Sequence, residues 1–518
     1  MSAEKTTDTD LYNAADDLLE RNLVAGRADK AAVIDTNGSH TYGDLNARAN
    51  RFANALTAMG LEMEHRIVLC MHDTVDFPAC FLGAIKAGVI PIPINTRLTE
   101  KDYEFILADS RARALVVSEN LLDAFTPHLD NHALLRHVVV VGNDTGGRHS
   151  LSELLDTAAD TFQPAPTRAD DMCFWLYTSG TTGTPKGSVH LHAHLIRTAE
   201  LYAIPTLGIC ESDIVYSAAK LFFDYGLGNA LTFPFAVGAT AVLLEGPPMP
   251  DVICEILRTH KPTIFYGVPT LYSMLLASDL IPDAEDHALR LCVSAGEALP
   301  SDLLNRWADK MGTEILDGLG STEMLHIFLT NSQGDARPNS SGKAVPGYDL
   351  RIVDEDGAPM APGELGNLHV AGPTGAVMYW NQREKSRETF LGTWTVTGDK
   401  YSIDGEGYYI YGGRSDDMLK VGGIYVSPFE VEGALIAHEA VLEAAVVGHP
   451  DHDNLIKPKA FIVLQDGINA SDNLAAELQN TVKNTLAEYK YPRWIEFTDN
   501  LPKTATGKIQ RFKLRDAG

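Results

Sequence analysis

Short apolar stretches alternate with amphipathic ones in the N-terminal part of the chain, and this alternation limits the possible folds more than any other feature. Thr41 and Asp44 form a capping-type start before apolar residues spaced three and four apart, which predicts a helix that closes at Gly60. Three strand candidates follow, at residues 67–70, 89–94 and 114–117. Because helices alternate with strands, we expect an α/β core.

The chain has 518 residues, which is more than one compact core normally supports. We therefore expect two or more domains. Towards the C-terminus, strand-like stretches at 444–447 and 460–464 precede a helix candidate with an apolar residue at every fourth position from Leu474 to Leu486. These elements predict a small α+β domain behind the α/β core.

Acidic residues outnumber basic ones, with 69 Asp and Glu against 42 Lys and Arg, so the net charge is −27. Nucleic acids and anionic membranes are bound through basic surfaces, and this excess of acid argues against both partners. Residues 1–10 lack the basic start and apolar core of a signal peptide, which predicts a cytoplasmic protein. Six cysteines without a Cys-x-x-Cys pair predict buried, reduced thiols.

The most apolar long window of the sequence is 221–244. It contains Asp224, Asn229 and Pro234, so we expect buried strand and turn there and not a membrane-spanning helix.

The segment from Tyr177 to Gly187 consists almost entirely of glycines, hydroxyl residues and one lysine, Lys186. Glycines let backbone N–H groups approach a polyphosphate, hydroxyls donate further hydrogen bonds, and the lysine adds a positive charge. Pro185 before the lysine and Gly187 after it depart from the Walker A pattern. An apolar run precedes the segment and helical composition follows Val189, so we expect a phosphate-binding loop that joins a strand to a helix. The alternative is a surface turn that binds nothing.

His190, His192 and His194 alternate just behind this loop. On a strand they would share one face, an arrangement that suits zinc. In a helix His190 and His194 would share a face and His192 would not. We favour the start of a helix over a zinc site.

Four further motifs accompany the loop, in a fixed order along the chain. They are Asp317-Gly318-Leu319-Gly320-Ser321-Thr322-Glu323-Met324, Thr397-Gly398-Asp399, Gly412-Gly413-Arg414-Ser415-Asp416-Asp417 and the run from Pro502 to Arg511. Together they resemble the adenylate-forming superfamily, which includes acyl-CoA and aryl-CoA ligases, luciferases and the adenylation domains of peptide synthetases. The resemblance implies ATP, Mg²⁺ and a thiol such as coenzyme A as reactants.

The resemblance also implies roles for individual residues. Lys508 would act in adenylation, Lys186 would neutralise phosphate charge, and Glu323 would help to hold magnesium. Taken alone, Glu323 could also be an acid at a helix N-terminus, and Lys508 could belong to an ordinary basic tail. The implied contacts to ATP or AMP are Thr178, Ser179, Gly180, Thr181, Thr182, Gly183, Gly296, Glu297, Asp317, Gly318, Thr322, Asp399 and Arg414.

The resemblance divides the chain into a large N-terminal domain, 1–413, with β-sheets and packed helices, and a small mobile α+β domain, 414–518. Asp416 takes the hinge position, while Gly422 and Gly423 would line a channel for the pantetheine arm of coenzyme A or form an ordinary turn. A carboxylate would attack the α-phosphate of ATP, pyrophosphate would leave, and the thiol would displace AMP to give a thioester.

Residues 217–229 and 323–328 resemble the corresponding segments of benzoate-CoA ligases, which implies benzoate or an amino- or hydroxy-substituted benzoate as the acid. The implied acyl pocket consists of Asp224, Tyr225, Gly320, Leu325, His326 and Ile327. Two positions depart from the pattern. Leu319 replaces an aromatic residue that would stack on adenine, and Asp224 replaces a small apolar one. Asp224 would either bind a polar substituent of the ring or point to solvent.

Two other functions remain open at this point. A ligase that loads a carrier protein through a phosphopantetheine thiol would use the same chemistry, and a non-catalytic sensor of aryl acids would keep the fold alone. The sequence leaves the oligomeric state open, with a homodimer as one expectation.

Overall fold

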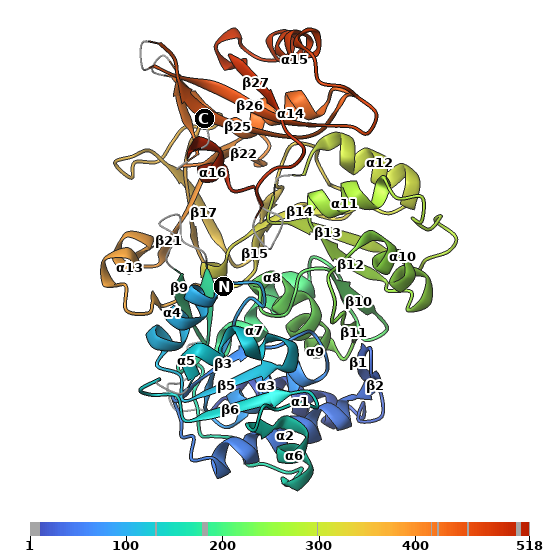
Figure 1. Cartoon of the computed structure of the whole chain (residues 1–518), viewed down its shortest axis with the longest axis vertical. Helices are drawn as coiled ribbons and strands as arrows, with labels where there is room; N and C mark the ends of the chain where they lie inside the picture. Colours follow the sequence, from blue (N-terminus) through green and yellow to red (C-terminus); the bar gives the residue numbers. More distant parts are fainter. Residues whose placement is uncertain are drawn as a thin grey trace.

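The computed structural model describes residues 11–129, 132–178, 185–297, 299–415, 417–421, 424–452, 455–503 and 509–516. Figure 1 shows the C-terminal elements at one end of the molecule and the remaining elements below them. No helix within the described ranges is long and apolar enough to cross a membrane.

The largest sheet has nine strands in the order β16-β15-β14-β13-β12-β10-β11-β1-β2. Its central strands are parallel, whereas β2, β15 and β16 pair antiparallel at its edges. The bounds are β1 Ala31–Asp35, β2 Gly38–Thr41, β10 Ile214–Ser217, β11 Thr240–Val242, β12 Ile264–Gly267, β13 Leu291–Ala295, β14 Ile315–Gly320, β15 Ile327–Thr330 and β16 Lys343–Ala344.

A second, wholly parallel sheet has the order β4-β3-β5-β6-β7. Its strands are β3 Arg66–Cys70, β4 Ile90–Pro93, β5 Ala114–Ser118, β6 His137–Val141 and β7 His149–Ser150. The three predicted strands between residues 67 and 117 are therefore confirmed, and so is the α/β core. The helix predicted behind Thr41 is α2, Tyr42–Ala58, and the Thr41 and Asp44 side chains form its capping box.

Two smaller antiparallel sheets complete the N-terminal part. One has the order β19-β9-β8, and the other joins β17, β18, β21 and β20, with β22 on the far side of β21. Their bounds are β8 Met172–Thr178, β9 Lys186–Leu191, β17 Asp349–Val353, β18 Gly366–Ala371, β19 Met378–Tyr379, β20 Phe390–Leu391, β21 Trp394–Ile403 and β22 Tyr409–Arg414.

Helices cover these sheets. In the N-terminal part they are α1 Ala14–Val24, α3 Asp76–Lys86, α4 Glu100–Ser110, α5 Thr126–Leu129, α6 Leu151–Thr157, α7 His192–Thr198, α8 Asp224–Leu227, α9 Phe233–Val237, α10 Pro250–Thr259, α11 Pro269–Leu276, α12 Ser301–Met311 and α13 Arg383–Thr389. Short 3-10 or π segments are η1 Glu119–Ala124, η2 Ala199–Ala203, η3 Gly228–Thr232 and η4 Thr322–Met324.

The C-terminal elements form a three-stranded sheet, a hairpin and packed helices. The sheet has the order β25-β26-β27, and the hairpin joins β23 to β24. The bounds are β23 Leu419–Val421, β24 Ile424–Val426, β25 Val441–Pro450, β26 Ile456–Leu464, β27 Trp494–Phe497, α14 Pro428–Ile436, α15 Asp472–Thr485, η5 Glu488–Lys490 and α16 Arg511–Asp516. The predicted strands near 444 and 460 and the predicted helix near 474 are confirmed.

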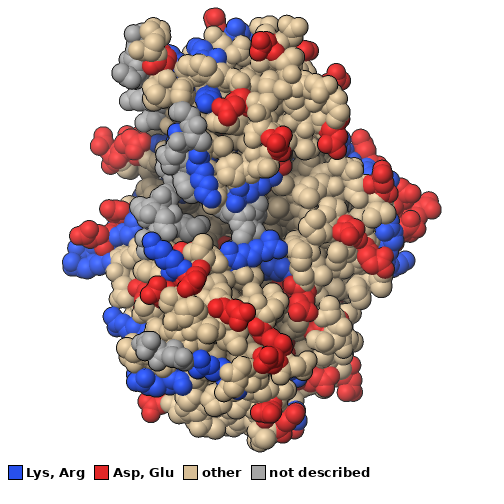
Figure 2. All heavy atoms as spheres, viewed as in Figure 1, with Lys and Arg blue, Asp and Glu red and all other residues tan. Residues whose placement is uncertain are grey.

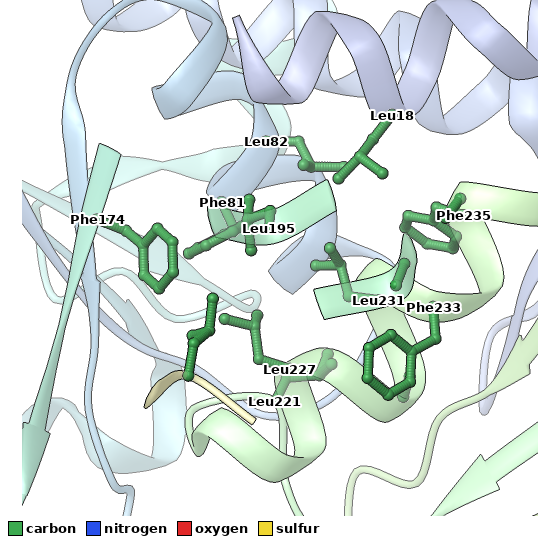
Figure 3. Close-up of a cluster of buried hydrophobic side chains, with 14 of the residues drawn as sticks. Leu18, Phe81, Leu82, Phe174, Leu195, Leu221, Leu227, Leu231, Phe233 and Phe235 are labelled. Carbon is green, nitrogen blue, oxygen red and sulfur yellow. The ribbon is translucent and has the colours of Figure 1, made fainter. Parts of the chain in front are cut away.

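Apolar side chains from distant parts of the sequence converge in the N-terminal core. Figure 3 shows Leu18 and Leu82, from α1 and α3, together with side chains of α7, η3 and α9. Full burial of a Leu or Phe side chain contributes about 1.5–3 kcal/mol. The apolar clusters of the N-terminal part use residues between Ala14 and Tyr409, and those of the C-terminal part use residues between Leu419 and Leu514.

Two local predictions are wrong. The window 221–244 is mostly helical, because α8, η3 and α9 follow one another before β11. Pro234 is tolerated there since it lies in the first turn of α9, next to the wider π turn of η3. The strand before residue 179 is followed by a second strand and not by a helix, because Lys186 to Leu191 pair antiparallel with β8 as β9.

The cysteines are free, as predicted, but their burial differs from the prediction at one position. Cys210 is exposed, whereas the other five are buried.

Candidate active site

The β8–β9 hairpin positions Lys186. Thr178 ends β8 and Lys186 begins β9, and the two are paired across the hairpin. The neighbouring β19 extends this sheet, with Trp380 N donating to Gly187 O at 2.8 Å. Ser179, Gly180, Thr181, Thr182 and Gly183 of the predicted phosphate loop lie outside the described residues. Lys186 is therefore held in a strand that pairs with β8.

Glu323 lies in the 3-10 turn η4, directly after β14, and its neighbours hold that turn through their backbone carbonyls. His190 Nε2 donates to Thr322 O at 2.8 Å, and Ala376 N donates to Glu323 O at 2.6 Å. Thr374 Oγ1 donates to Met324 O at 2.7 Å. Three consecutive carbonyls are thus bound from outside the turn, which limits the positions that the Glu323 side chain can reach.

Tyr379 brings Glu323 and Lys186 together. Its hydroxyl donates to Glu323 Oε1 at 2.6 Å, and Lys186 Nζ lies 4.7 Å from the centroid of its ring. Burial raises the pKa of the Tyr379 hydroxyl, and the Glu323 charge raises it further, so the hydroxyl keeps its proton. The sequence analysis missed Tyr379, since an aromatic residue in a two-residue strand gives no signal of its contacts.

The third and fourth motifs meet across the β21–β22 pair. Asp399 and Arg414 are paired across the two strands, and Arg414 Nη1 lies 3.2 Å from Asp399 Oδ1 and donates to Thr397 O at 3.1 Å. Gly398 has a φ of 77°, which only glycine adopts readily. The Arg414 charge also lowers the pKa of Tyr379, against the larger effect of burial. Motifs that are separate in the sequence therefore face the same region.

Asp317 and Gly318 lie on β14, next to β13. Asp317 Oδ1 is buried and has no hydrogen bond to a described residue, and burial raises the pKa of this carboxyl group well above its usual value. Gly318 packs against Ile327, which leaves little room for a larger residue. Gly296 has a φ of 90°, and Thr270 donates to Glu297 Oε2 at 3.0 Å. These observations leave the predicted nucleotide contacts of Gly296 and Glu297 untested.

His326 is the centre of the predicted acyl pocket. It is only 2% exposed, and three aromatic rings surround it: Tyr202 and Tyr225 with centroids at 5.6 Å and Phe233 at 4.5 Å. Burial lowers the pKa of His326 to about 3, so the ring is neutral at ordinary pH. Its Nε2 lies 3.1 Å from Asn229 Oδ1, which can only accept, so Nε2 carries the proton and Nδ1 is the free acceptor among the described residues.

The other predicted pocket residues lie around His326 to different degrees. Tyr225 contacts the His326 ring and donates to Val293 O at 3.1 Å. Gly320 adjoins the His326 backbone so closely that a Cβ there would lie 2.8 Å from its carbonyl carbon. Leu325 and Ile327 are buried beside it, Leu325 with a φ of 67°. Asp224 is half-buried at the first residue of α8, so the structure brings five of the six residues into one apolar neighbourhood.

The histidines near the loop form part of the support for η4. His190 lies in β9, one residue before its end, while His192 and His194 lie in α7. His190 Nδ1 lies 3.1 Å from His194 Nδ1, and His192 Nδ1 accepts a hydrogen bond from Ala14 N. Burial lowers the pKa values of His190 and His192 to about 4 and that of His194 to about 3. Within the described ranges, no group of three or more His, Cys, Asp or Glu could hold a metal ion.

Lys508, Asp416, Gly422 and Gly423 lie outside the described residues. Their neighbours are held by ion pairs. Lys503 binds Glu443 at 2.6 Å, and Arg511 binds the buried Glu432 at 2.7 Å. Arg511 also lies 3.6 Å from Asp417, the residue after the predicted hinge position.

Charge is distributed unevenly over the molecule. Figure 2 shows Lys and Arg side chains gathered along the recess between the C-terminal part and the rest, while Asp and Glu side chains are spread over the remainder of this face. The negative net charge of −27 therefore coexists with a locally basic recess. Such a local arrangement can attract a polyanion that the overall charge would repel.

Comparison with known proteins identifies the family. The profile of the AMP-binding enzyme family matches residues 19–380, and that of its C-terminal domain matches residues 430–508. This chain is an AMP-binding enzyme. The two matches confirm an adenylate-forming fold with a large N-terminal and a small C-terminal domain, and they confirm the superfamily resemblance.

Three relatives show which subgroup of the family is most similar. The benzoate–CoA ligase of Thauera aromatica is 61% identical over 508 residues, or 98% of this chain and 96% of that protein. The 4-hydroxybenzoate–CoA/benzoate–CoA ligase of Rhodopseudomonas palustris is 47% identical over 98% of this chain and 94% of that protein. The crystal structure of the anthranilate CoA ligase AuaEII with anthranoyl-AMP has a TM-score of 0.94 at 45% identity, covering 98% of this chain and 97% of that one. The chain thus belongs with the benzoate–CoA ligase-like members of the family.

Proposed function

We propose that this chain is an AMP-forming acid–thiol ligase that activates an aromatic carboxylic acid with ATP and transfers it to coenzyme A. The observation that carries the proposal is the 61% identity to a benzoate–CoA ligase over both domains, 98% of the chain. The geometry supports it, because a cation and a carboxylate lie beside Tyr379 and a separate group of aromatic rings surrounds His326. The products would be an aryl-CoA thioester, AMP and pyrophosphate.

The residues present fit a magnesium ion. Magnesium prefers oxygen ligands and usually takes one or two protein carboxylates together with substrate phosphates. Glu323 offers such a carboxylate, since its Oε2 forms no hydrogen bond to a described residue. When bound, the ion would neutralise charge on the phosphates. Magnesium binding at Glu323 therefore belongs to the proposal.

The charged side chains would do most of the work in the first half-reaction, because a carboxylate must approach a triphosphate that is itself anionic. Lys186 would neutralise phosphate oxygens next to the loop, and Lys508 would stabilise charge that develops around the α-phosphate. Asp399 would bind the ribose hydroxyls, with Arg414 holding its carboxylate at 3.2 Å. No side chain needs to bond covalently to the acid.

The acyl pocket favours a neutral aromatic ring. Tyr225, Phe233 and the neutral His326 supply apolar area, which provides most of the affinity for a ring. Two acceptors, the Asp224 carboxylate and His326 Nδ1, would discriminate among ring substituents. Each can accept a hydrogen bond from a hydroxyl or amino group, and the ring of benzoate carries no such donor. We therefore include hydroxy- and aminobenzoates among the proposed acids.

The domain division at 413/414, a rotation of the C-terminal domain about Asp416 and a pantetheine channel at Gly422 and Gly423 also belong to the proposal. The division into two domains is supported by the apolar clusters, since those of the C-terminal part begin at Leu419 and share no residue with the others. Coenzyme A is favoured over a carrier protein because the 61% identity to a benzoate–CoA ligase extends over nearly the whole length of both proteins.

A substrate panel tests the proposal. Purified protein is incubated with ATP, Mg²⁺ and benzoate or its amino, hydroxy, halogen and methyl derivatives, and AMP release is measured with and without coenzyme A. We expect steady AMP release only when an aromatic acid and coenzyme A are both present, with the aryl-CoA detected by mass spectrometry. AMP release with aliphatic acids alone, or adenylate formation without transfer to coenzyme A, would contradict the proposal and favour another acid or a carrier-protein thiol.

A further inference from the structure

Tyr379 contacts the two residues to which the proposed function assigns opposite charges in nucleotide binding. Its hydroxyl donates to Glu323 Oε1 at 2.6 Å, which is short for a hydrogen bond and typical of one to a charged acceptor. Its ring lies 4.7 Å from Lys186 Nζ, within the range of a cation–π contact. One side chain therefore sets the positions of both groups.

The backbone of Tyr379 is fixed from two directions. Its strand, β19, pairs with β9, the strand that carries Lys186, and Val377 N donates to Val189 O at 3.0 Å. On the other side, Ser386 Oγ accepts from Tyr379 N at 2.9 Å and donates to Gln382 O at 2.8 Å. Because Tyr379 is only 3% exposed, its ring has little freedom to move away.

The opposite partner, Glu323, is fixed only as far as its backbone. The carbonyls of η4 are bound from outside, but the carboxylate itself has one hydrogen bond to a described residue, from Tyr379. Without that bond the carboxylate would rotate between several rotamers. A ligand that must first be ordered binds a metal less tightly than one already in place.

We infer that Tyr379 is a positioning residue for the metal–nucleotide complex: its hydroxyl holds Glu323 Oε1, so that Oε2 is available to magnesium, and its ring supports Lys186 beside the phosphates. The inference rests on the proposed function for the identity of the ligand, MgATP. It assigns Tyr379 no proton transfer and no contact with the acid.

The test uses Tyr379→Phe in the full-length protein, since this change removes the hydroxyl and keeps the ring. Tyr408→Phe is a matched control. The Tyr408 hydroxyl also donates to a carboxylate at 2.6 Å, that of Asp335, and its ring also lies against cations, those of Arg337 and Lys343. Both variants lose one oxygen from the same kind of contact, but only Tyr379 adjoins Glu323.

Two readouts are measured. The first is the binding of Mn²⁺ to the protein with α,β-methylene-ATP, which cannot release pyrophosphate, followed by electron paramagnetic resonance. The second is the Mg²⁺ dependence of acyl-adenylate formation, compared with the conversion of synthetic benzoyl-AMP and coenzyme A to the thioester, which needs no metal. Thermal unfolding shows whether the variants are equally folded.

We expect Tyr379→Phe to weaken Mn²⁺ binding and to raise the required Mg²⁺ concentration by about tenfold or more, as is usual for the loss of a group that orients a metal ligand. The thioester half-reaction, the KM for the acid and the behaviour of Tyr408→Phe stay as in the unaltered protein. Equal metal dependence in Tyr379→Phe and the unaltered protein would overturn the inference. So would equal losses in both half-reactions, because these would indicate a purely structural role.

This experiment separates the inference from the proposed function. If no aromatic acid is turned over, the function fails, but Mn²⁺ binding with the nucleotide analogue still measures the contribution of Tyr379. If aryl-CoA is formed and the Tyr379→Phe variant binds Mn²⁺ normally, the function stands and the inference fails.

Discussion

Single side chains set the polarity of the candidate acyl pocket. His326 is neutral because burial lowers its pKa to about 3, and its bond to Asn229 Oδ1 fixes the proton on Nε2. Asp224, in contrast, is a half-buried carboxylate at the first residue of α8, next to Tyr225 in the chain. The proposal is that a hydroxyl or amino group of the substrate donates a further hydrogen bond to this carboxylate, which has several acceptor sites.

Asp224→Ala tests whether this carboxylate selects the acid. We expect the variant to lose preference for amino- or hydroxybenzoates relative to benzoate by about tenfold, the worth of one hydrogen bond to a charged group. Relative kcat/KM values for the three acid types measure the change, with Asp224→Asn as a variant that keeps the size and removes the charge. An unchanged ranking would place Asp224 in solvent beside the pocket.

His326→Phe removes the second acceptor without changing the aromatic surroundings. Since His326 Nδ1 has no hydrogen-bond partner among the described residues, we expect a loss of activity confined to acids with a donor substituent. Benzoate itself should keep its kcat/KM to within about threefold, the range of a modest packing change. Equal losses for benzoate and hydroxybenzoates would assign His326 a packing role alone.

At the scale of elements, the π turn η3 supports the pocket through a glycine. Gly228 lies against the His326 ring, and a Cβ at this position would overlap with Cδ2 of that ring. The sequence predicted neither the helix nor this contact, because the glycines and Pro234 of the window indicate turns when they are read singly. The wider spacing of a π turn, which accommodates Pro234 in α9, depends on packing against residues that lie about a hundred positions away.

Gly228→Ala is therefore expected to raise the KM for the acid and to lower the free energy of unfolding by about 1–3 kcal/mol, the usual cost of overpacking. Gly433→Ala is the control. This glycine lies within α14 and has open space around its Cα, so the substitution should leave the activity unchanged and stabilise the helix by up to about 1 kcal/mol. Chemical denaturation and steady-state kinetics measure both. A neutral Gly228→Ala would show that the ring can move aside.

The buried histidines at the β9–α7 junction make the stability of the folded protein depend on pH. His190 and His194 remain neutral in the folded protein down to pH values of about 4 and 3, whereas an unfolded histidine takes up its proton below 6.5. Between these values the unfolded chain binds more protons, so stability falls as the pH falls, by about 1.4 kcal/mol per pH unit for each such histidine.

Denaturation curves measured between pH 7 and pH 5 test this dependence. We expect the stability of His194→Gln to fall less steeply with decreasing pH than that of the unaltered protein. The difference in slope should be about 1.4 kcal/mol per pH unit, which corresponds to one proton. Gly433→Ala, which removes no titrating group, should keep the slope. Identical slopes in all three proteins would mean that His194 is not neutral in the folded state.

At the scale of the whole molecule, the sequence predicted the fold class, the two-part division and the chemistry, because these depend on motifs whose residue types are dictated by the nucleotide. Lys186 and Glu323 both adjoin Tyr379, and the Arg414 charge of the Asp399–Arg414 pair acts on the same tyrosine, although these residues are far apart in the chain. What escaped prediction is the residue that connects two of them. Tyr379 acts through tertiary contacts alone, and neither its neighbours nor its spacing indicate a site.

The proposed mechanism also depends on Lys508, which belongs to the proposed C-terminal domain. Lys508→Ala is expected to slow acyl-adenylate formation by about a hundredfold or more, since one charge that stabilises the transition state is lost. Thioester formation from synthetic benzoyl-AMP and coenzyme A should continue, because the α-phosphate is already joined to the acid and no pyrophosphate has to leave. Lys513→Ala, on α16, removes a positive charge that is close to Lys508 in the sequence and serves as the control. Stopped-flow measurement of each half-reaction separates the two steps. Full adenylation activity in Lys508→Ala would mean that the positive charge needed at the α-phosphate comes from the N-terminal domain, and the proposed domain rotation would lose its purpose.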